Sequence, residues 1–455
     1  MRPREQSRGQ DDLFRARLDQ IIDMEHELVR LAGLIDWQLL GSKLGEVYAD
    51  GPGQPPLPTR LMAGLAILKH TFNLSDEDLV RRWVENPYFQ YFCGEEHFRH
   101  KPPFDRSSMT RWRQRMGAER LDFLLQESLA VALKTEAIAP KDLSRIIVDT
   151  TVQEKAITFP TDAKLLHRMR EKLVKLAKTH GLKLRQGYPR VGKRALIKHQ
   201  RYRHAKQFKR AGRELRRLRT FLGRVVRDVD RQVRDDPWLN WIFRPALFLA
   251  GRVHRQRPGQ RGRKVYSIHA PEVECIGKGK AHKPYEFGVK VSVATPVSAP
   301  RGGQFVLAAK ALPGSPYDGH TLQIVIPHVE GIIGNEIQRI IGDKGYRGHG
   351  APAPYDMRVY VSEQRRGVTK QIARELKRRS AVEPVIGHMK AEHRMDRNYL
   401  RYATGDANNA VLAAVGYNFA RLLAWLRELL CALLRICMSL PACLPETATP
   451  YPQAT

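Results

Sequence analysis

One strongly basic segment constrains the fold of this chain more than any other feature. Residues 164–234 contain 25 Lys and Arg but only four acids, so this segment carries +21 of the net charge of +31. Such a charge density repels itself in a compact fold unless a polyanion supplies counter-charge, and nucleic acid is the usual polyanion. An anionic membrane surface and a merely solvated basic face are the alternatives.

The apolar spacing inside this segment predicts helices. The stretches LLHRMREKLVKLAKTH and RELRRLRTFLGRVVRDV follow the helical period, so we expect two long helices joined by a loop around residues 187–192. Residues 164–262 then form a basic helical insertion that follows the DNA backbone. We expect its contacts with DNA to come from Arg203, Lys209, Arg210, Arg216 and Arg217.

Strand-like segments flank the insertion on both sides. SRIIVDTT precedes it, and KVYSIHAP, YEFGVKVSVATP and GQFVLAAKALPG follow it. A helix (DGHTLQIVIPHVEGIIG), two further strands (EIQRIIGDKGYRG and MRVYVSEQ) and a helical segment over 370–397 complete the pattern. This order predicts an α/β fold with a mixed sheet, in the order of a ribonuclease-H-like core built from residues 141–163 and 263–404.

Helical segments are expected at both ends of the chain. Residues 1–140 are predicted to form a helical N-terminal DNA-binding domain, because the apolar spacing in their central part is helical. A short basic helix capped by Asp105 and ended by Gly117 would present Arg111 and Arg113 to DNA. A solvated basic helix in an ordinary bundle is the alternative. A C-terminal helix over 405–440 and a loose tail over 441–455 complete the chain.

Several classes of protein are disfavoured by composition. The five cysteines include no CxxC pair, which argues against a disulfide framework and a zinc ribbon and fits the reducing cytosol. Charged residues interrupt the most apolar stretch, 411–444, so we expect no membrane span. No GxxxxGK[ST] motif is present, so we expect no nucleotide cofactor. A cytoplasmic, nucleoid-associated protein is the expectation.

Two acids end strands that we expect to be neighbours in the sheet. Asp149 closes IIVD and Asp343 closes RIIGD. Either acid alone is better explained as a cap of the following turn. Together they indicate a site, because functional acids lie where strands end and loops open the surface. A third acid should come from a helix beside them, and by spacing alone Glu383, Glu375, Glu392 and Asp396 all qualify.

Four blocks give the chain a specific resemblance. VDTTVQEKAITFPTD, GSPYDGHTL, IIGDKGYRG and the segment Arg379-x3-Glu383-x6-Lys390 resemble the signature blocks of DDE-type bacterial insertion-sequence transposases. The third acidic block of that family reads Tyr-x2-Arg-x3-Glu-x6-Lys, and Leu376 stands at the tyrosine position here. The resemblance spans roughly residues 30–420, and it is what selects Glu383 over its rivals.

The resemblance implies a mechanism and partners. Asp149, Asp343 and Glu383 would hold two Mg²⁺ or Mn²⁺ ions, and Arg379 and Lys390 would contact DNA near the cleavage point. The implied partners are the terminal inverted repeats of the transposon and target DNA, and paired ends favour a homodimer on DNA. Another ribonuclease-H-like nuclease and a non-enzymatic basic nucleic-acid-binding protein are the alternatives. Trp238 and Trp241 read either as a hydrophobic plug between the insertion and the core or as a platform for unpaired bases.

Overall fold

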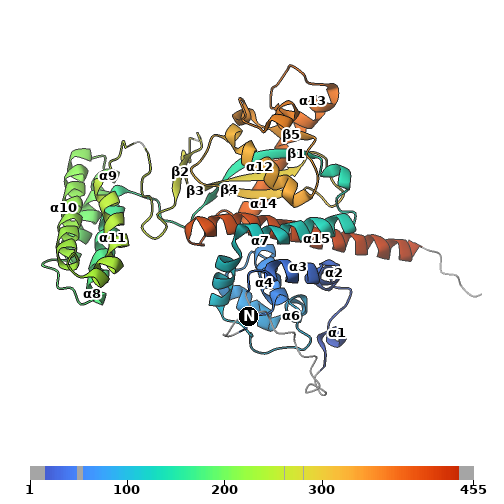
Figure 1. Cartoon of the computed structure of the whole chain (residues 1–455), viewed down its shortest axis with the longest axis horizontal. Helices are drawn as coiled ribbons and strands as arrows, with labels where there is room; N and C mark the ends of the chain where they lie inside the picture. The colour runs from blue at the N-terminus through green and yellow to red at the C-terminus, as the bar shows by residue number, and fades with distance from the viewer. Residues whose placement is uncertain (1–15, 49–54, 261, 280, 440–455) are drawn as a thin grey trace, which may run out of the picture.

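The computed structural model describes residues 16–48, 55–260, 262–279 and 281–439. For Met357 and residues 432–439 it describes the backbone alone. It divides into a helical N-terminal part, a sheet with helices on both faces, and a helical insertion that stands apart from the sheet (Figure 1). The predicted loose tail at 441–455 lies outside the described residues.

Seven helices form the N-terminal part, as the helical spacing predicts. The last of them, α7, bends at Gly117, where φ is +68°, so the glycine ends the short basic helix as expected. The Asp105 carboxylate accepts a hydrogen bond from the amide of Ser107 and caps this helix. The helices are α1 (Leu18–Ile21), α2 (Glu27–Leu34), α3 (Trp37–Gly45), α4 (Thr59–Thr71), α5 (Asp76–Glu85), α6 (Pro87–Phe92) and α7 (Arg106–Lys134).

The sheet is mixed, and its order is β2-β3-β1-β5-β6, with β4 paired to β3 outside this path. Strand β1 pairs antiparallel with β3 and parallel with β5, so it lies at the centre. Its apolar residues Ile146, Ile147 and Val148 are fully buried, as expected of a central strand covered on both faces. The strands are β1 (Arg145–Glu154), β2 (Glu274–Gly277), β3 (Tyr285–Pro296), β4 (Ala308–Leu312), β5 (Arg339–Gly342) and β6 (Val359–Val361).

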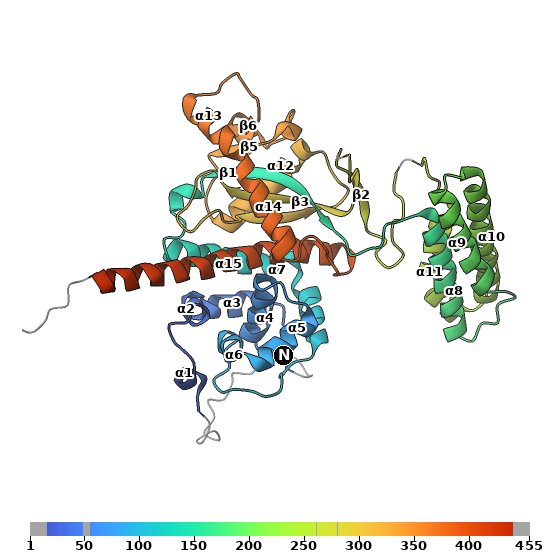
Figure 2. The same ribbon diagram turned by 180° about the vertical axis from the view of Figure 1, so that it is seen from behind.

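Helices from the second half of the chain cover the sheet. Helix α12 (Asp318–Ile333) lies on one face and α14 (Val382–Glu392) on the other (Figures 1 and 2). The helical segment expected over 370–397 is split into α13 (Lys370–Lys377), a 3₁₀ turn η5 (Arg378–Ala381) and α14. Further 3₁₀ turns are η2 (Pro140–Asp142), η3 (Lys344–Tyr346) and η4 (Ala353–Arg358).

The long C-terminal helix α15 (Tyr402–Ser439) joins the sheet to the N-terminal part (Figure 2). It packs against α7, α4, α2 and β4, and its residues from Ala410 to Leu426 contribute to the same core as β1 and β5. The apolar C-terminal stretch therefore serves in core packing over this range. Among the described residues, no helix is both long and apolar enough to cross a membrane.

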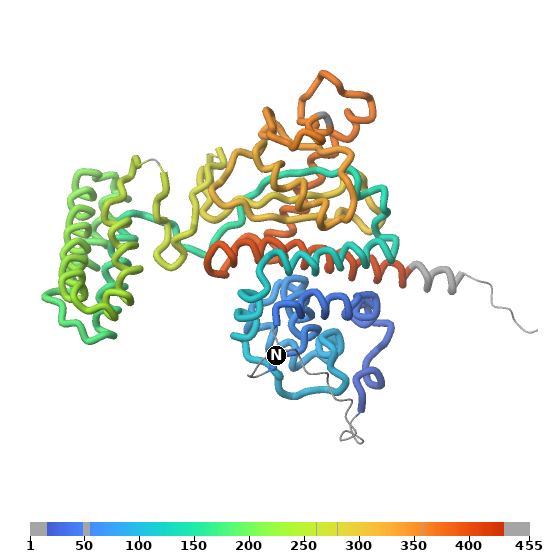
Figure 3. The backbone as a smooth tube through the Cα atoms, viewed as in Figure 1, coloured from blue at the N-terminus to red at the C-terminus, as the bar shows by residue number. Residues whose placement is uncertain are grey.

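The two long helices predicted within residues 164–234 are present, but another helix begins at Pro189, inside the loop expected around residues 187–192. The described residues of the insertion contain four helices in all. They are α8 (Asp162–Thr179), α9 (Pro189–His204), α10 (Phe208–Val233) and α11 (Pro237–Arg255). They enclose a hydrophobic core of their own, and Figure 3 follows the chain from β1 into this bundle and back to β2. The strand expected at KVYSIHAP was also wrong, because those residues are irregular and β2 begins only at Glu274.

Candidate active site

The parallel pairing of β1 with β5 brings Asp149 and Asp343 level with each other. Asp343 directly follows β5, but the prediction that Asp149 ends its strand was wrong, because β1 continues to Glu154 and Asp149 pairs with Val293 of β3. Ile147 lies opposite Ile341, and Asp149 and Asp343 each follow two residues later. The amide of Thr150 donates to Asp149 Oδ1 at 2.7 Å, and the amide of Gly345 donates to Asp343 Oδ1 at 2.8 Å. Each carboxylate thus accepts a hydrogen bond from a nearby backbone amide, and the bond from Gly345 makes Asp343 the cap of η3.

Arg379 connects the third acid to the first. Its guanidinium donates to Glu383 Oε1 at 2.7 Å and lies 3.5 Å from Asp149 Oδ2. Glu383 is in the first turn of α14, and its side chain is 58% exposed, whereas that of Asp149 is only 16% exposed. Arg379 therefore joins Glu383 to Asp149, and Asp343 lies close enough to Asp149 for its charge to act on that carboxyl.

The charge at this site is incompletely compensated. The pKa of Asp149 is raised from its ordinary value of 3.8 to about 6, mainly by burial and also by the carboxylates of Asp343 and Glu383, while the hydrogen bond from the Thr150 amide and the charge of Arg379 lower it. A carboxyl with such a pKa marks a place where an additional cation would be favourable.

The donors suit hard divalent ions, although Arg379 separates them in this arrangement. Carboxylate oxygens are the ligands that Mg²⁺ and Mn²⁺ prefer. Within the described residues, no three His, Cys, Asp or Glu side chains are already placed as a ligand set. The Arg379 guanidinium lies between Asp149 and Glu383 and supplies the positive charge there.

A fourth carboxylate, Asp318, belongs to the same cluster and was missed as a site residue. Its Oδ1 accepts from Thr150 Oγ1 at 2.8 Å and from Lys290 Nζ at 3.0 Å. A Cβ placed on Gly345 would lie 3.0 Å from both Asp318 Oδ2 and Asp343 Oδ1, so these two carboxylates converge on that glycine. Asp318 stands inside the block GSPYDGHTL, which was the available signal.

The buried ring of Tyr346 adjoins this cluster. Burial raises the pKa of its hydroxyl well above the ordinary value of 10.0, and the carboxylates of Asp149, Asp318 and Asp343 raise it further. The side chain is 1% exposed and packs in the main core, so it closes the inner side of the acidic cluster.

The rival third acids have other surroundings. Glu375 is buried and accepts from Arg145 at 2.8 Å and from Arg339 at 2.6 Å, which ties α13 to β1 and β5. Glu392 lies 2.8 Å from a ring nitrogen of His388 at the exposed end of α14. Asp396 is exposed beyond that helix. The ion pairs of Arg379 are with Glu383 and Asp149, which sets Glu383 apart from these three acids.

The residues expected to contact DNA outside the insertion differ in exposure. Arg111 is exposed and donates to Ser107 Oγ at 3.1 Å. Arg113 is only 2% exposed and forms two hydrogen bonds with the Asp76 carboxylate, at 3.0 and 2.7 Å, so its guanidinium is unavailable to a phosphate in this fold. We therefore withdraw Arg113 as a DNA contact.

Lys390 also departs from a simple surface lysine. It is half-buried, and burial lowers the pKa of its ammonium group, while Glu286 and Glu154 raise it. It lies one turn after Ile386 and nearly two turns after Glu383 on α14, toward the end of β1 rather than at Asp149. A contact between Lys390 and DNA remains a proposal.

The basic residues predicted on the insertion are exposed. Arg203 stacks over Phe208 at 5.2 Å and Arg210 over Tyr202 at 5.9 Å, which holds both guanidinium groups near the turn between α9 and α10. Arg217 forms an ion pair with Glu214 at 3.0 Å. The five exposed side chains on α9 and α10 are Arg203, Lys209, Arg210, Arg216 and Arg217.

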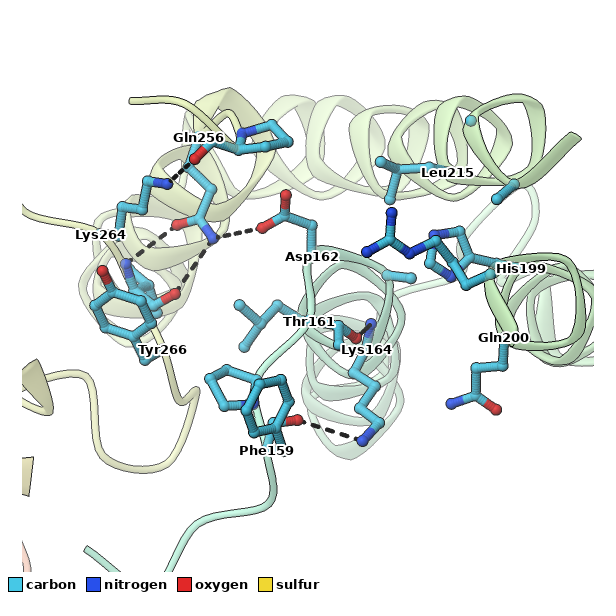
Figure 4. A pocket seen from close by; sticks show the side chains of 18 of the residues that line it. Phe159, Thr161, Asp162, Lys164, His199, Gln200, Leu215, Gln256, Lys264 and Tyr266 are labelled. Atoms are coloured by element: carbon cyan, nitrogen blue, oxygen red, sulfur yellow. Dashed lines mark hydrogen bonds between the residues drawn. The ribbon is translucent and has the colours of Figure 1, made fainter. Parts of the chain in front are cut away.

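A cavity of about 610 Å³ lies where the insertion joins the rest of the chain, and none of the acids of the candidate site lines it (Figure 4). Gln256 connects two of its walls, donating to Asp162 Oδ1 at 3.2 Å and to the carbonyl of Val265 at 3.2 Å. Aromatic residues including Phe159 and Tyr266 form much of the remaining wall. These contacts hold the start of α8 against the returning segment.

The idea that Trp238 and Trp241 plug the gap between insertion and core was wrong. Both lie on α11, and their side chains are 61% and 76% exposed. Trp238 contacts the ring of His180 within the insertion itself.

The family model that matches the chain concerns its N-terminal part. Residues 16–115 match the family model described as Transposase domain (DUF772), which covers α1 to α6 and the first part of α7. A protein of Rhizobium meliloti, described as "Uncharacterized protein ORF8 in nfe locus", is 51% identical over 208 residues, which are 46% of this chain and all of that protein. The chain belongs to the same family as this rhizobial protein. The transposase domain supports a bacterial insertion-sequence transposase. No solved structure matches the chain.

Proposed function

We propose that the chain is a DDE-type transposase that cleaves the ends of its own element and joins them to target DNA by a cut-and-paste route. The observation that carries this proposal is the arrangement of Asp149 and Asp343 at matched positions on adjacent parallel strands, with Glu383 linked to Asp149 through Arg379. The transposase domain in the N-terminal part supports the same reading.

The sheet supports a ribonuclease-H-like core as the host of this chemistry. A central strand has antiparallel neighbours on one side and parallel neighbours on the other. Asp149 lies within the central strand, and Asp343 directly follows its parallel neighbour. A large helical insertion is accommodated after the first strand, where it leaves the pairing of the sheet intact. We propose this fold from the strand order and not from a match to a solved structure.

Asp149, Asp343 and Glu383 are the residues that would hold the two Mg²⁺ or Mn²⁺ ions. Two metal ions bound side by side would activate the attacking oxygen and stabilise the leaving oxygen in phosphoryl transfer. Asp149 and Asp343 are held by backbone amides, so their oxygens are preorganised, whereas Glu383 would complete the set from an exposed position in the first turn of α14. Asp318, fixed by Thr150 and Lys290, orients the side of the cluster near Asp343.

The basic surfaces would hold the DNA. Arg111 on the N-terminal part and the five exposed basic side chains of α9 and α10 are available to phosphates. Arg379 carries a planar guanidinium that suits a phosphate close to the acids, and Lys390 would act further along α14. The partners proposed are the terminal inverted repeats and target DNA, bound by a homodimer at the bacterial nucleoid.

The test replaces each acid separately in the full chain. Asp149→Asn, Asp343→Asn and Glu383→Gln should each abolish Mg²⁺-dependent cleavage of DNA carrying the element's end while leaving DNA binding within about twofold. Glu392→Gln, on the same helix as Glu383, is the matched control and should cleave like the parent. Unchanged cleavage in any of the three variants would remove that residue from the catalytic set.

Joining separates a transposase from another nuclease on the same fold. A transposase should link the cut 3′ end covalently to a second DNA molecule, which appears as a larger labelled product on a denaturing gel. A chain that cleaves but never joins would favour the simple nuclease. A chain that binds DNA and never cleaves with any divalent ion would favour the non-enzymatic binder.

A further inference from the structure

Helix α11 exposes a row of large apolar side chains that nothing in the described chain covers. Trp238, Trp241 and Phe248 are 61%, 76% and 67% exposed. With Pro245 between them, they recur at intervals of three and four residues, so they share one face of the helix. The opposite face of α11 is buried in the core of the insertion, through Phe243, Ala246, Leu249, Ala250 and Val253.

The size of this face is unusual for a solvated helix. A buried Trp or Phe covers about 200 Å², so the three exposed fractions leave roughly 400 Å² of aromatic surface in contact with water. Contiguous apolar patches of this size commonly mark interaction sites. The repeat of three and four residues is the spacing by which one helix packs along another.

The aromatic face lies away from the most basic helix of the insertion. Helices α9 and α11 each pack against both α8 and α10, so they occupy opposite sides of that pair. Helix α9 holds six Lys and Arg and no acid, and it contributes to the surface proposed to bind DNA. DNA bound along α9 and α10 would leave the aromatic face of α11 free for a protein partner.

The charges at the two ends of α11 complement each other in an antiparallel pair, whereas the exposed Arg244 places a positive charge of each copy near the centre. Asp235 and Asp236 precede the helix, whereas Arg252 and Arg255 lie in its last turn. A second copy packed antiparallel would bring the acidic beginning of each helix to the basic end of the other. A parallel arrangement would place like charges together, which is unfavourable.

We propose that two copies of this chain associate through α11 in an antiparallel, two-fold symmetric pair centred near Pro245. In this arrangement Trp241 packs against the partner's Phe248, and Trp238 packs against the partner's Arg252. A two-fold axis requires each contact to occur twice. The pairs Trp241–Phe248 and Trp238–Arg252 satisfy this requirement, because both are centred on the same point near Pro245. This surface would hold together the homodimer of the proposed function. The pairing depends on the residues of α11 and not on those of the acidic site.

The interface is expected to be weak in the absence of DNA. Two copies would bury roughly 800 Å² of aromatic surface, which is below the usual area of a stable complex. The net charge of +21 in residues 164–234 of each copy opposes association. Added salt should therefore strengthen dimerisation by screening this repulsion, whereas it should weaken binding to DNA.

The association can be measured by sedimentation velocity of the full chain without DNA or divalent ions. The parent should form a concentration-dependent dimer that becomes tighter as salt is raised. Trp241→Ser should weaken dimerisation by about tenfold or more, because an interface aromatic is lost twice per dimer. Phe159→Ser is the matched control, since this aromatic is 66% exposed away from α11, and it should dimerise like the parent.

A charge exchange tests the orientation. Asp235→Arg and Arg255→Asp should each weaken the dimer, and the double variant should recover parental affinity, because its helix ends are again complementary. Thermal unfolding of each variant shows whether the exposed changes leave the fold intact. A parent that stays monomeric at every protein and salt concentration overturns the proposal, as does a double variant that fails to recover.

The same variants distinguish a DNA surface from a protein surface. If Trp241→Ser dimerises normally but binds single-stranded DNA more weakly, the aromatic face belongs to DNA and the proposed pairing is wrong. Cleavage is measured separately with the acid variants above. Failure of the dimer interface therefore leaves the catalytic proposal untouched, and failure of catalysis leaves the interface untouched.

Discussion

Replacing Asp149 by Asn should stabilise the metal-free protein, because this carboxylate carries a charge that its surroundings disfavour. Its pKa rises from 3.8 to about 6 on folding. A carboxyl that binds its proton more tightly in the folded state lowers the free energy of unfolding as pH rises from 3.8 through 6. A change of about two pKa units corresponds to at most about 3 kcal/mol above this window. The amide leaves Arg379 without one partner, so we expect a net gain of about 1–2 kcal/mol.

The assay is urea unfolding of the parent and the Asp149→Asn chain with divalent ions chelated, at about pH 8 and about pH 4.5. The variant should unfold at higher urea at about pH 8, and the difference should shrink at about pH 4.5, where the parental carboxyl is largely protonated. Added Mg²⁺ should stabilise the parent more than the variant. A variant no more stable than the parent at about pH 8 would refute the claim that this site has excess negative charge.

Three further predictions test the surroundings of the site and the DNA surface. Glu375→Ala should lower the free energy of unfolding by about 3–5 kcal/mol in urea, because it leaves Arg145 and Arg339 without their shared partner, whereas Glu392→Ala on the surface should change it by less than about 1 kcal/mol. The slope of log binding constant against log salt concentration for DNA should become shallower by about 4 when the five exposed basic residues of α9 and α10 are neutralised together, namely Arg203, Lys209, Arg210, Arg216 and Arg217. Neutralising Arg244, Arg252 and Arg255 on α11 should change this slope less per charge removed. Gly345→Ala should reduce cleavage by about 10- to 100-fold with the thermal midpoint nearly unchanged, because its Cβ would push apart the carboxylates of Asp318 and Asp343; parental cleavage rates would contradict this geometry.

The sequence located the two strands that carry or precede Asp149 and Asp343, because short apolar runs give a clear signal. It ended the first strand too early, since the polar residues after Asp149 also pair with β3 and β1 continues to Glu154. Asp149 and Asp343 each follow a run of buried aliphatic residues, and the parallel pairing then places them level. Glu383 was different, since spacing alone left four candidates and only the resemblance selected it. The structure adds a physical reason, because Arg379 joins Glu383 to Asp149 while Glu375 is held by two other arginines.

The insertion was predicted less well because two of its helices lack a typical amphipathic pattern. Among the residues of α9 only Gly192 and Ala195 are buried, so the helix has almost no apolar stripe to detect. Helix α11 has two apolar faces, one in the core and one exposed, and this hides its period. KVYSIHAP has the composition of a strand, but the edge of β3 is occupied by Glu274–Gly277 instead. Tertiary pairing decided these cases, and local composition could not.

Arg379 links the two halves of the proposed function, since it is both the counter-charge of the acids and the arginine expected to meet DNA. In the metal-free arrangement it contacts Asp149 and Glu383, where divalent ions would otherwise compensate the charge. A DNA phosphate that attracts this guanidinium would free both carboxylates, so DNA and metal binding should favour each other. Arg379→Gln removes the internal counter-charge, and we expect it to bind Mn²⁺ more tightly than the parent without DNA but to gain less affinity when DNA is added. Calorimetric titration of Mn²⁺ into both chains, with and without DNA, measures this coupling. Equal gains in the two chains would show that Arg379 does not carry it.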